Sequence, residues 1–81
     1  MEKRIGKITI LILDRSRSAE INSIISEFSD IVLCRQGLPF HQRPVAVISI
    51  IVEGSPDRIN ALTGRLGRLQ DVESKAVLTK Q

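Results

Sequence analysis

The residues with the greatest intrinsic reactivity are Cys34 and His41, the only cysteine and the only histidine of the chain. A thiol beside an imidazole can act as nucleophile and base, and both side chains bind zinc or nickel. Catalysis would also need an orienting third group, and a metal site within one chain would need further ligands. We therefore expect a buried, inert Cys34, a surface His41, no enzyme activity, no metal and no cofactor. A metal shared between subunits is the alternative that remains.

Two polar turns, at residues 14–18 and 53–57, offer a different chemistry. Each follows an apolar run and precedes a helix-like pattern. Backbone N–H groups at a helix N-terminus suit a small anion or an amino-acid carboxylate, and Asn22 and Asn60 lie one turn further on. The alternative is two ordinary capped turns. Gly64 and Gly67 fall late in a helix, so they do not form a phosphate-binding loop.

The second turn lies in the most regular stretch of the sequence. Residues 45–52 form an apolar, β-branched run that predicts a strand buried on both faces or nearly so. Ser55 is a typical helix N-cap, and Pro56 suits the first helical position. Apolar residues then recur at helical spacing up to Gly67, which we expect to end the helix in a left-handed conformation.

A fainter copy of this stretch lies 38 residues earlier, as the pair Asn22 and Asn60 shows. Both halves read strand, polar turn, amphipathic helix and second strand. Two such halves predict an α+β fold of the ferredoxin-like type, βαββαβ, with a four-stranded antiparallel sheet and both helices on one face. The 81 residues are expected to form a single domain, 1–81.

The expected elements of the first half are a strand at residues 5–13, a helix at about 19–28 capped by Ser16 or Ser18, and a strand at 31–35. A turn with an apolar tip, residues 36–42, follows and can serve as a pocket wall or partner contact, or pack on a neighbour. The last strand covers residues 72–78 and alternates, as a strand with one wet face does.

Both faces of the central strands carry aliphatic residues, for example Ile10 and Leu11. Two helices cover only one face of a sheet, so the other face needs a different cover. A second subunit is the simplest candidate, and a small domain gains stability from such burial. We therefore expect a homo-oligomer.

The composition narrows the remaining classes of partner. The net charge is +3, basic and acidic residues are interspersed, and aromatic residues are nearly absent. The scarcity of aromatic residues argues against binding of single strands by base stacking, and direct binding of nucleic acid is not expected. There is no signal peptide and no membrane-spanning run, which predicts a cytoplasmic protein.

Residues 14–54 and 59–80 resemble the small proteins described as regulators of the iron-only hydrogenase system. The most specific segments are Arg35 to Pro39 (RQGLP) and Leu62 to Gly67 (LTGRLG). The resemblance implies a ferredoxin-like domain, similar to amino-acid-binding ACT domains and to the C-terminal domain of nickel-responsive repressors, that assembles as dimers or tetramers. The chain has a single histidine and few residues before Ile5 for the DNA-binding segment of those repressors, so we expect neither nickel sensing nor direct operator binding.

The leading hypothesis is a non-enzymatic, oligomeric regulatory domain that binds a small effector or a protein partner. The candidate ligand-binding residues flank the first turn and the predicted hairpin: Asp14, Arg15, Ser18, Asn22, Arg35, Gly37, Pro39 and Arg43. The alternative is a DNA-associated transcriptional regulator that uses surface arginines: Arg15, Arg17, Arg65 and Arg68.

Overall fold

The structure is a computed structural model that describes residues 2–40 and 42–80. Four strands, two α-helices and a short 3₁₀ helix follow one another along the chain. Their bounds are β1 Arg4–Ile12, η1 Arg15–Arg17, α1 Ser18–Glu27, β2 Val32–Pro39, β3 Ala46–Gly54, α2 Pro56–Gly67 and β4 Val72–Leu78. The predicted βαββαβ order is therefore confirmed.

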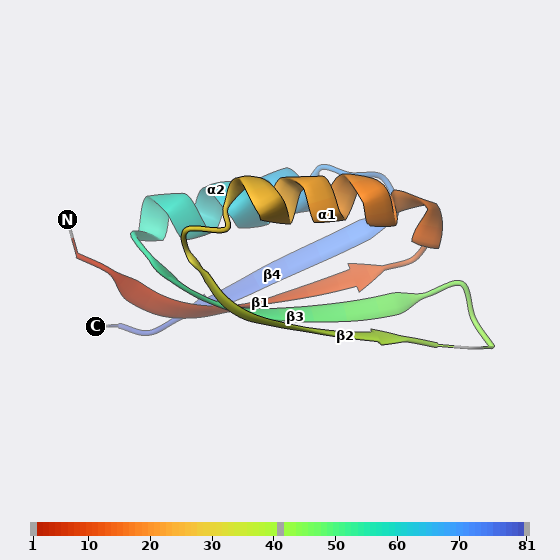
Figure 1. Cartoon of the computed structure of the whole chain (residues 1–81), viewed down its shortest axis with the longest axis horizontal. Helices are drawn as coiled ribbons and strands as arrows, with labels where there is room; N and C mark the ends of the chain where they lie inside the picture. Colours follow the sequence, from red (N-terminus) through yellow and green to blue (C-terminus); the bar gives the residue numbers. More distant parts are fainter. Residues whose placement is uncertain (1, 41, 81) are drawn as a thin grey trace.

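The four strands form one antiparallel sheet in the order β2-β3-β1-β4. Figure 1 shows both helices lying on the same side of this sheet, with the two chain ends at one end of the molecule. Ile10 pairs with Ile48, the residue that the 38-residue shift places over it. The internal repeat therefore coincides with an approximate two-fold relation between the two central strands.

The core lies between the sheet and the helices. Alternate residues of the central strands, such as Ile10 and Ile50, are fully buried there beneath Ile21 of α1 and Leu62 of α2. Period-two alternation in strands and spacings of three and four in helices bring these side chains to one layer. The remaining members of this apolar cluster, all buried, are Ile8, Ile12, Ile24, Ile25, Phe28, Ile31, Ile48, Val52, Ile59, Leu66 and Val72.

The start of α2 agrees with the sequence, but its end does not. The Ser55 hydroxyl accepts a hydrogen bond from the Arg58 N–H at 3.3 Å, and Pro56 occupies the first turn. Gly67 has no left-handed backbone; Asp71, with φ of 64°, has one instead. The prediction for Gly67 was wrong because the chain continues past it through right-handed Arg68 and turns only before β4.

The first turn is capped by a different residue from the one expected. Neither Ser16 nor Ser18 caps α1, whose N-cap position is Arg17 without a side-chain hydrogen bond. Asp14 instead accepts a hydrogen bond from the Ser16 N–H at 3.0 Å and starts the 3₁₀ helix η1. The extra turn moves the capping position upstream, to the residue that follows β1 closely.

The strand β2 is longer and less regular than predicted. Four residues assigned to a loop, 36–39, extend it to Pro39. Its register against β3 shifts between Val32 and Cys34, so Cys34 pairs with Ile51 rather than with the buried Ile50. This bulge turns Cys34 away from the helices, and the thiol is exposed. The prediction of a buried Cys34 was therefore wrong.

Candidate functional site

The face of the sheet opposite the helices carries an apolar strip. The register places five apolar residues on this face. They are Leu11 of β1, Leu38 of β2, Val47 and Ile51 of β3, and Val77 of β4. Thr9 and Ser49 separate them along the strands, Lys7 lies between Ile51 and Val77, and Glu73 pairs with Leu11. We call this surface, on the odd-numbered side of β1, β3 and β4, the open face.

The open face bears much of the exposed apolar surface of the chain. Leu38 is 59 % exposed and Val77 is 75 % exposed, and Ile5 at the start of β1 is 49 % exposed. Leu11 and Ile51 at the centre are half-buried by their neighbours. Leu38, Val47 and Leu11 are direct neighbours across three strands. Exposed apolar patches mark sites of association in soluble proteins.

A second site forms where the first turn meets the tip of the β2–β3 hairpin. The Arg15 guanidinium donates hydrogen bonds to the backbone carbonyls of Phe40 and of Arg43, the latter at 2.6 Å. These contacts join residues that are 25 and 28 positions apart in sequence. Arg15 therefore holds the hairpin tip against η1, and two of the predicted site residues come together.

A second contact between β2 and the helix layer, made by Arg35, lies one turn further along α1. The Arg35 guanidinium donates to the Asn22 amide oxygen at 2.5 Å. Arg35 pairs with the helix-facing Ile50, so the bulge of β2 is also what turns this side chain towards α1. Gly37 and Pro39 follow on the same side of β2, paired with Ile48 and Ala46.

The remaining predicted residues border this cluster. Asp14 is exposed, and hydrogen bonds from the Ser16 backbone and side chain hold the pKa of its carboxyl below the ordinary value. Ser18 is half-buried at the start of α1. We name the cluster of Asp14, Arg15, Ser18, Asn22, Arg35, Gly37, Pro39 and Arg43 the hairpin corner. The sequence suggested these residues as ligand-binding, which stays a prediction, and it did not predict the contacts of Arg15 with Arg43 and of Arg35 with Asn22.

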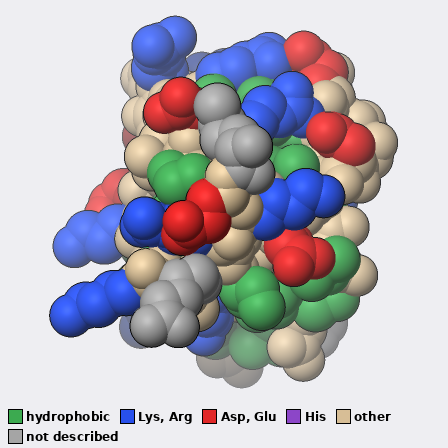
Figure 2. Space-filling model, turned by 90° about the vertical axis from the view of Figure 1, so that its left-hand side faces the viewer, with side chains coloured by type: hydrophobic (Ala, Val, Ile, Leu, Met, Phe, Trp, Pro, Cys, Tyr) green, Lys and Arg blue, Asp and Glu red, His purple; other side chains and the backbone are tan. Residues whose placement is uncertain are grey.

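Most of the arginines considered for DNA binding have acidic or carbonyl partners. Arg17 pairs with Glu20 at 2.9 Å, and Arg65 pairs with Glu27 at 2.7 Å. Arg15 is used at the hairpin corner. Figure 2 views the end of the molecule that carries both chain ends, where basic and acidic side chains are interspersed. At this end of the molecule, such a mixture does not build the one-sign field that nucleic-acid binding uses.

The described residues can also be searched for groups of metal ligands and for membrane-spanning helices. Within residues 2–40 and 42–80, no three side chains of His, Cys, Asp or Glu gather as metal ligands would. The prediction of a surface His41 lies outside the described residues. Of the helices that the structure describes, none has the length and apolar character to cross a membrane.

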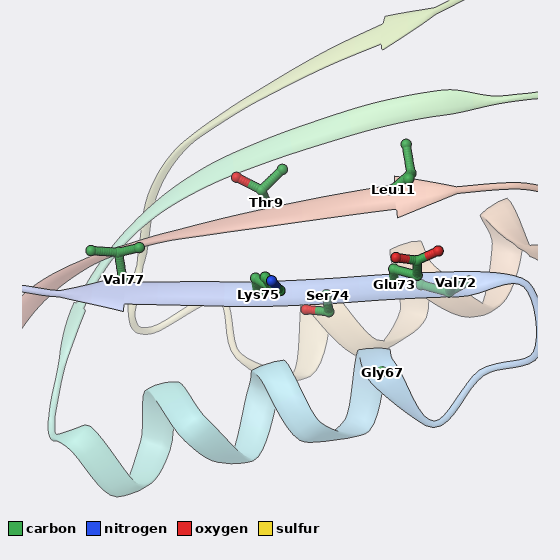
Figure 3. A pocket seen from close by; sticks show the side chains of 8 residues that line it. All are labelled: Thr9, Leu11, Gly67, Val72, Glu73, Ser74, Lys75 and Val77. Atoms are coloured by element: carbon green, nitrogen blue, oxygen red, sulfur yellow. The ribbon is translucent and has the colours of Figure 1, made fainter.

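A hollow of about 710 Å³ lies along the outer strand β4. Figure 3 shows its lining: Lys75 and Val77 lie with Thr9 and Leu11 on the side of the open face, while Ser74 points to the last turn of α2 at Gly67. The hollow therefore follows the free edge of the sheet rather than the hairpin corner. The sequence pattern did not predict a site at this edge.

The fold and the open face define a ferredoxin-like α+β domain with one uncovered sheet face. Residues 4–76 match the model of the TM1266-like family, described as "Iron-only hydrogenase system regulator, putative". The chain belongs to this family. A solved structure, uncharacterized protein TM1266 from Thermotoga maritima, is similar with 34% identity and a TM-score of 0.90, covering 98% of this chain and 100% of that one.

More distant solved structures share the fold alone. The designed protein Foldit4 is 13% identical with a TM-score of 0.58, covering 99% of both chains. CutA1 from Oryza sativa is 18% identical with a TM-score of 0.55, covering 96% of this chain and 82% of its own. No curated protein matches the chain. The family resemblance inferred from the sequence is thus confirmed, and the family's description is that of a regulator.

Proposed function

We propose that this protein is a non-enzymatic, cytoplasmic regulatory module of the iron-only hydrogenase system, built as a single domain that works as a homo-oligomer. Two copies cover each other's open face, and a small effector or a protein partner binds at the hairpin corner. Binding there favours one assembly over another, since a ligand shifts an equilibrium by its difference in affinity for the two states. The family membership supplies the hydrogenase context.

The open face is the observation that carries the assembly. Its exposed aliphatic residues, Leu38 and Val77 among them, lie on a surface that neither helix covers. Burying apolar surface stabilises a complex by roughly 25 cal/mol per Å² before the entropic costs of association. A second copy presents the same apolar strip, so a two-fold arrangement matches apolar residues with apolar residues.

The effector is proposed to carry a carboxylate or another anionic group. The hairpin corner combines the guanidinium groups of Arg15, Arg35 and Arg43 with the 3₁₀ turn, and all three arginines are exposed. Arginine presents several fixed donors that suit carboxylate oxygens. Because Arg15 and Arg35 also hold the hairpin to η1 and α1, a ligand that recruits them changes how β2 is anchored.

The assembly is tested by placing a charge on the open face. Leu38→Glu puts a carboxylate into the apolar strip on β2, and Ala61→Glu puts the same charge on the exposed side of α2. Light scattering coupled to size exclusion should show a smaller mass for Leu38→Glu and an unchanged mass for Ala61→Glu. Equal masses for both variants, with both folded, would reject the open face as the interface.

The effector site is tested by thermal shift with free amino acids and inorganic phosphate as probes. A compound that binds the hairpin corner should raise the melting temperature of the natural chain, and Arg35→Ala should abolish that shift. Arg68→Ala, which removes an exposed arginine beyond α2, is the control and should keep it. A shift that survives Arg35→Ala would place the binding site elsewhere.

A further inference from the structure

The strand β4 presents unpaired backbone groups along the free edge of the sheet. The Leu13 N–H donates to the Asp71 carbonyl and the Thr79 N–H donates to the Ile5 carbonyl, both at 2.8 Å. In this register, odd-numbered residues of β4 therefore exchange hydrogen bonds with β1. The N–H and C=O groups of Ser74 and Ala76 point outwards instead.

This edge lacks three of the devices that usually prevent strand pairing, and its charged residues, Glu73 and Lys75, have opposite signs. Proline, bulges and inward-turned charges commonly block exposed edges. Residues 72–78 contain neither proline nor glycine, and their pairing with β1 is continuous. The hollow beside them leaves space for another strand, and Gly67 adds no side chain at its border.

The side chains of β4 select one antiparallel register for a second copy. If Ser74 lies on the two-fold axis, Glu73 faces the partner's Lys75 and Lys75 faces the partner's Glu73. The Ser74 N–H then donates to the carbonyl of the partner's Ser74, and the Ala76 N–H to that of the partner's Val72. The Val72 N–H needs no partner there, because it already donates to the Leu69 carbonyl at 3.3 Å.

The Ser74 hydroxyl is a second, independent indication of this register. Its oxygen is buried beneath α2 and has no hydrogen-bond partner among residues 2–40 and 42–80. Buried hydroxyl groups without a partner are rare, because leaving one unpaired costs free energy. On the two-fold axis, the hydroxyl groups of Ser74 and the partner's Ser74 come within reach of each other.

Neighbouring registers are less favourable. Moving the axis to Lys75 keeps the outward groups paired but sets Lys75 directly against the partner's Lys75, and like charges in that position repel. Moving it to Ala76 separates Glu73 from the partner's Lys75. From the charges, the free backbone groups and the unpaired hydroxyl, we infer that two copies of this chain join edge to edge through β4, with Ser74 on the axis.

This edge pairing is distinct from the packing of open faces proposed above and does not depend on it. Two chains joined at β4 form one continuous eight-stranded antiparallel sheet, with the helices of both copies on one side. The open faces of the two copies then lie side by side, with Glu73 and Lys75 of both copies between them. Face packing would join two such dimers into a tetramer.

The register is tested by disulfide cross-linking in a Cys34→Ser background, which removes the natural thiol. In a hydrogen-bonded antiparallel pair the Cα atoms are about 5.5 Å apart, within the range of a disulfide. Mild oxidation should therefore link Ser74→Cys into a dimer. Ala76→Cys is the matched control on the same side of the same strand, and it should stay largely unlinked. Preferential linking of Ala76→Cys would overturn the register, and no linking of either variant would overturn the edge interface.

The charge pairing is tested by complementary variants. Glu73→Lys and Lys75→Glu each set like charges against each other twice in a homodimer, which should weaken self-association about tenfold. Mixed together, the two variants should associate with each other as tightly as the natural chain does with itself, because opposite charges again face each other. Mixing without recovery would contradict the pairing. Glu73→Lys and Lys75→Glu should each leave the packing of open faces at Leu38 intact. Loss of edge pairing can therefore be distinguished from loss of face packing.

Discussion

The two edge strands of the sheet, β2 and β4, differ in how regular they are. The edge at β2 has a bulge between Val32 and Cys34, a glycine at position 37 and Pro39 at its end, and Arg35 turns from it to the helix layer. The edge at β4 is a regular strand with free N–H and C=O groups. Irregular edges resist pairing and regular ones invite it. The first edge therefore holds the contacts of Arg35 with α1, and the second is the edge at which we propose that another copy pairs.

The difference also explains where side chains of different kinds are found. The bulge of β2 turns Cys34 to the open face and Arg35 to α1, so one inserted residue determines both. On β4, uninterrupted alternation puts Glu73 and Lys75 on one side and Ser74 on the other. The irregular edge at β2 thus places polar side chains near α1. The regular edge at β4 presents side chains that alternate between the two faces of the sheet.

The largest effect on the free energy of unfolding is expected at Gly54, the last residue of β3, which lies against the residue before β2. A Cβ on Gly54 would lie 2.9 Å from the Cγ2 atom of Ile31, which anchors the start of β2. Gly54→Ala should lower the free energy of unfolding by about 1–3 kcal/mol, because one of the two groups must move in a packed region. Urea denaturation measures this. Combining it with Ile31→Ala should give less than the sum of the two losses, and strict additivity would contradict the clash.

An opposite, smaller effect is expected at the glycine beside β4. A Cβ on Gly67 would meet no heavy atom within 4 Å, and its backbone is helical. Gly67→Ala should leave the free energy of unfolding unchanged or raise it by up to about 1 kcal/mol, since alanine favours helix over glycine. The same denaturation experiment checks this. A loss as large as that of Gly54→Ala would mean that the β4 side is as closely packed as the β2 side.

The smallest effect is expected at the ion pair that joins the two helices above the sheet. A hydrogen bond from Arg65 lowers the pKa of Glu27 below its ordinary value of 4.5. A lowered carboxyl pKa stabilises the fold above the unfolded value and loses that contribution as the pH falls through the folded value. Glu27→Gln should therefore remove a small part of the decline in melting temperature below pH 4.5. Identical acid profiles for the two chains would show that the pair contributes nothing.

Regular features of the fold could be predicted from the sequence. The alternation of β4, the Ser55 cap and the 38-residue repeat indicated the correct order of elements, because local patterns decide them. The bulge of β2 was missed, since nothing in the residues around Leu33 distinguishes an inserted residue from an ordinary strand residue. The wrong prediction for Cys34 results from this bulge and from the position of β2 at the edge of the sheet, where all of its residues after Val32 are exposed.

The candidate ligand-binding residues stay a prediction, and their contacts could not be predicted. Polar residues after β1 and in the segment 35–43 suggested them, yet the bonds of Arg15 to the hairpin depend on how far β2 extends. The β4 edge was not predicted as a site at all. Which strand lies at an edge, and which backbone groups point outwards, depend on sheet order and register rather than on residue type.

Both proposed interfaces require this chain to recognise a second copy of itself. Light scattering coupled to size exclusion measures this, over protein concentrations that span three orders of magnitude at roughly physiological salt. We predict a mass of two or four times the 9.0 kDa chain at the higher concentrations, falling on dilution. A mass of a single chain at every concentration would contradict both the edge pairing and the covered open face.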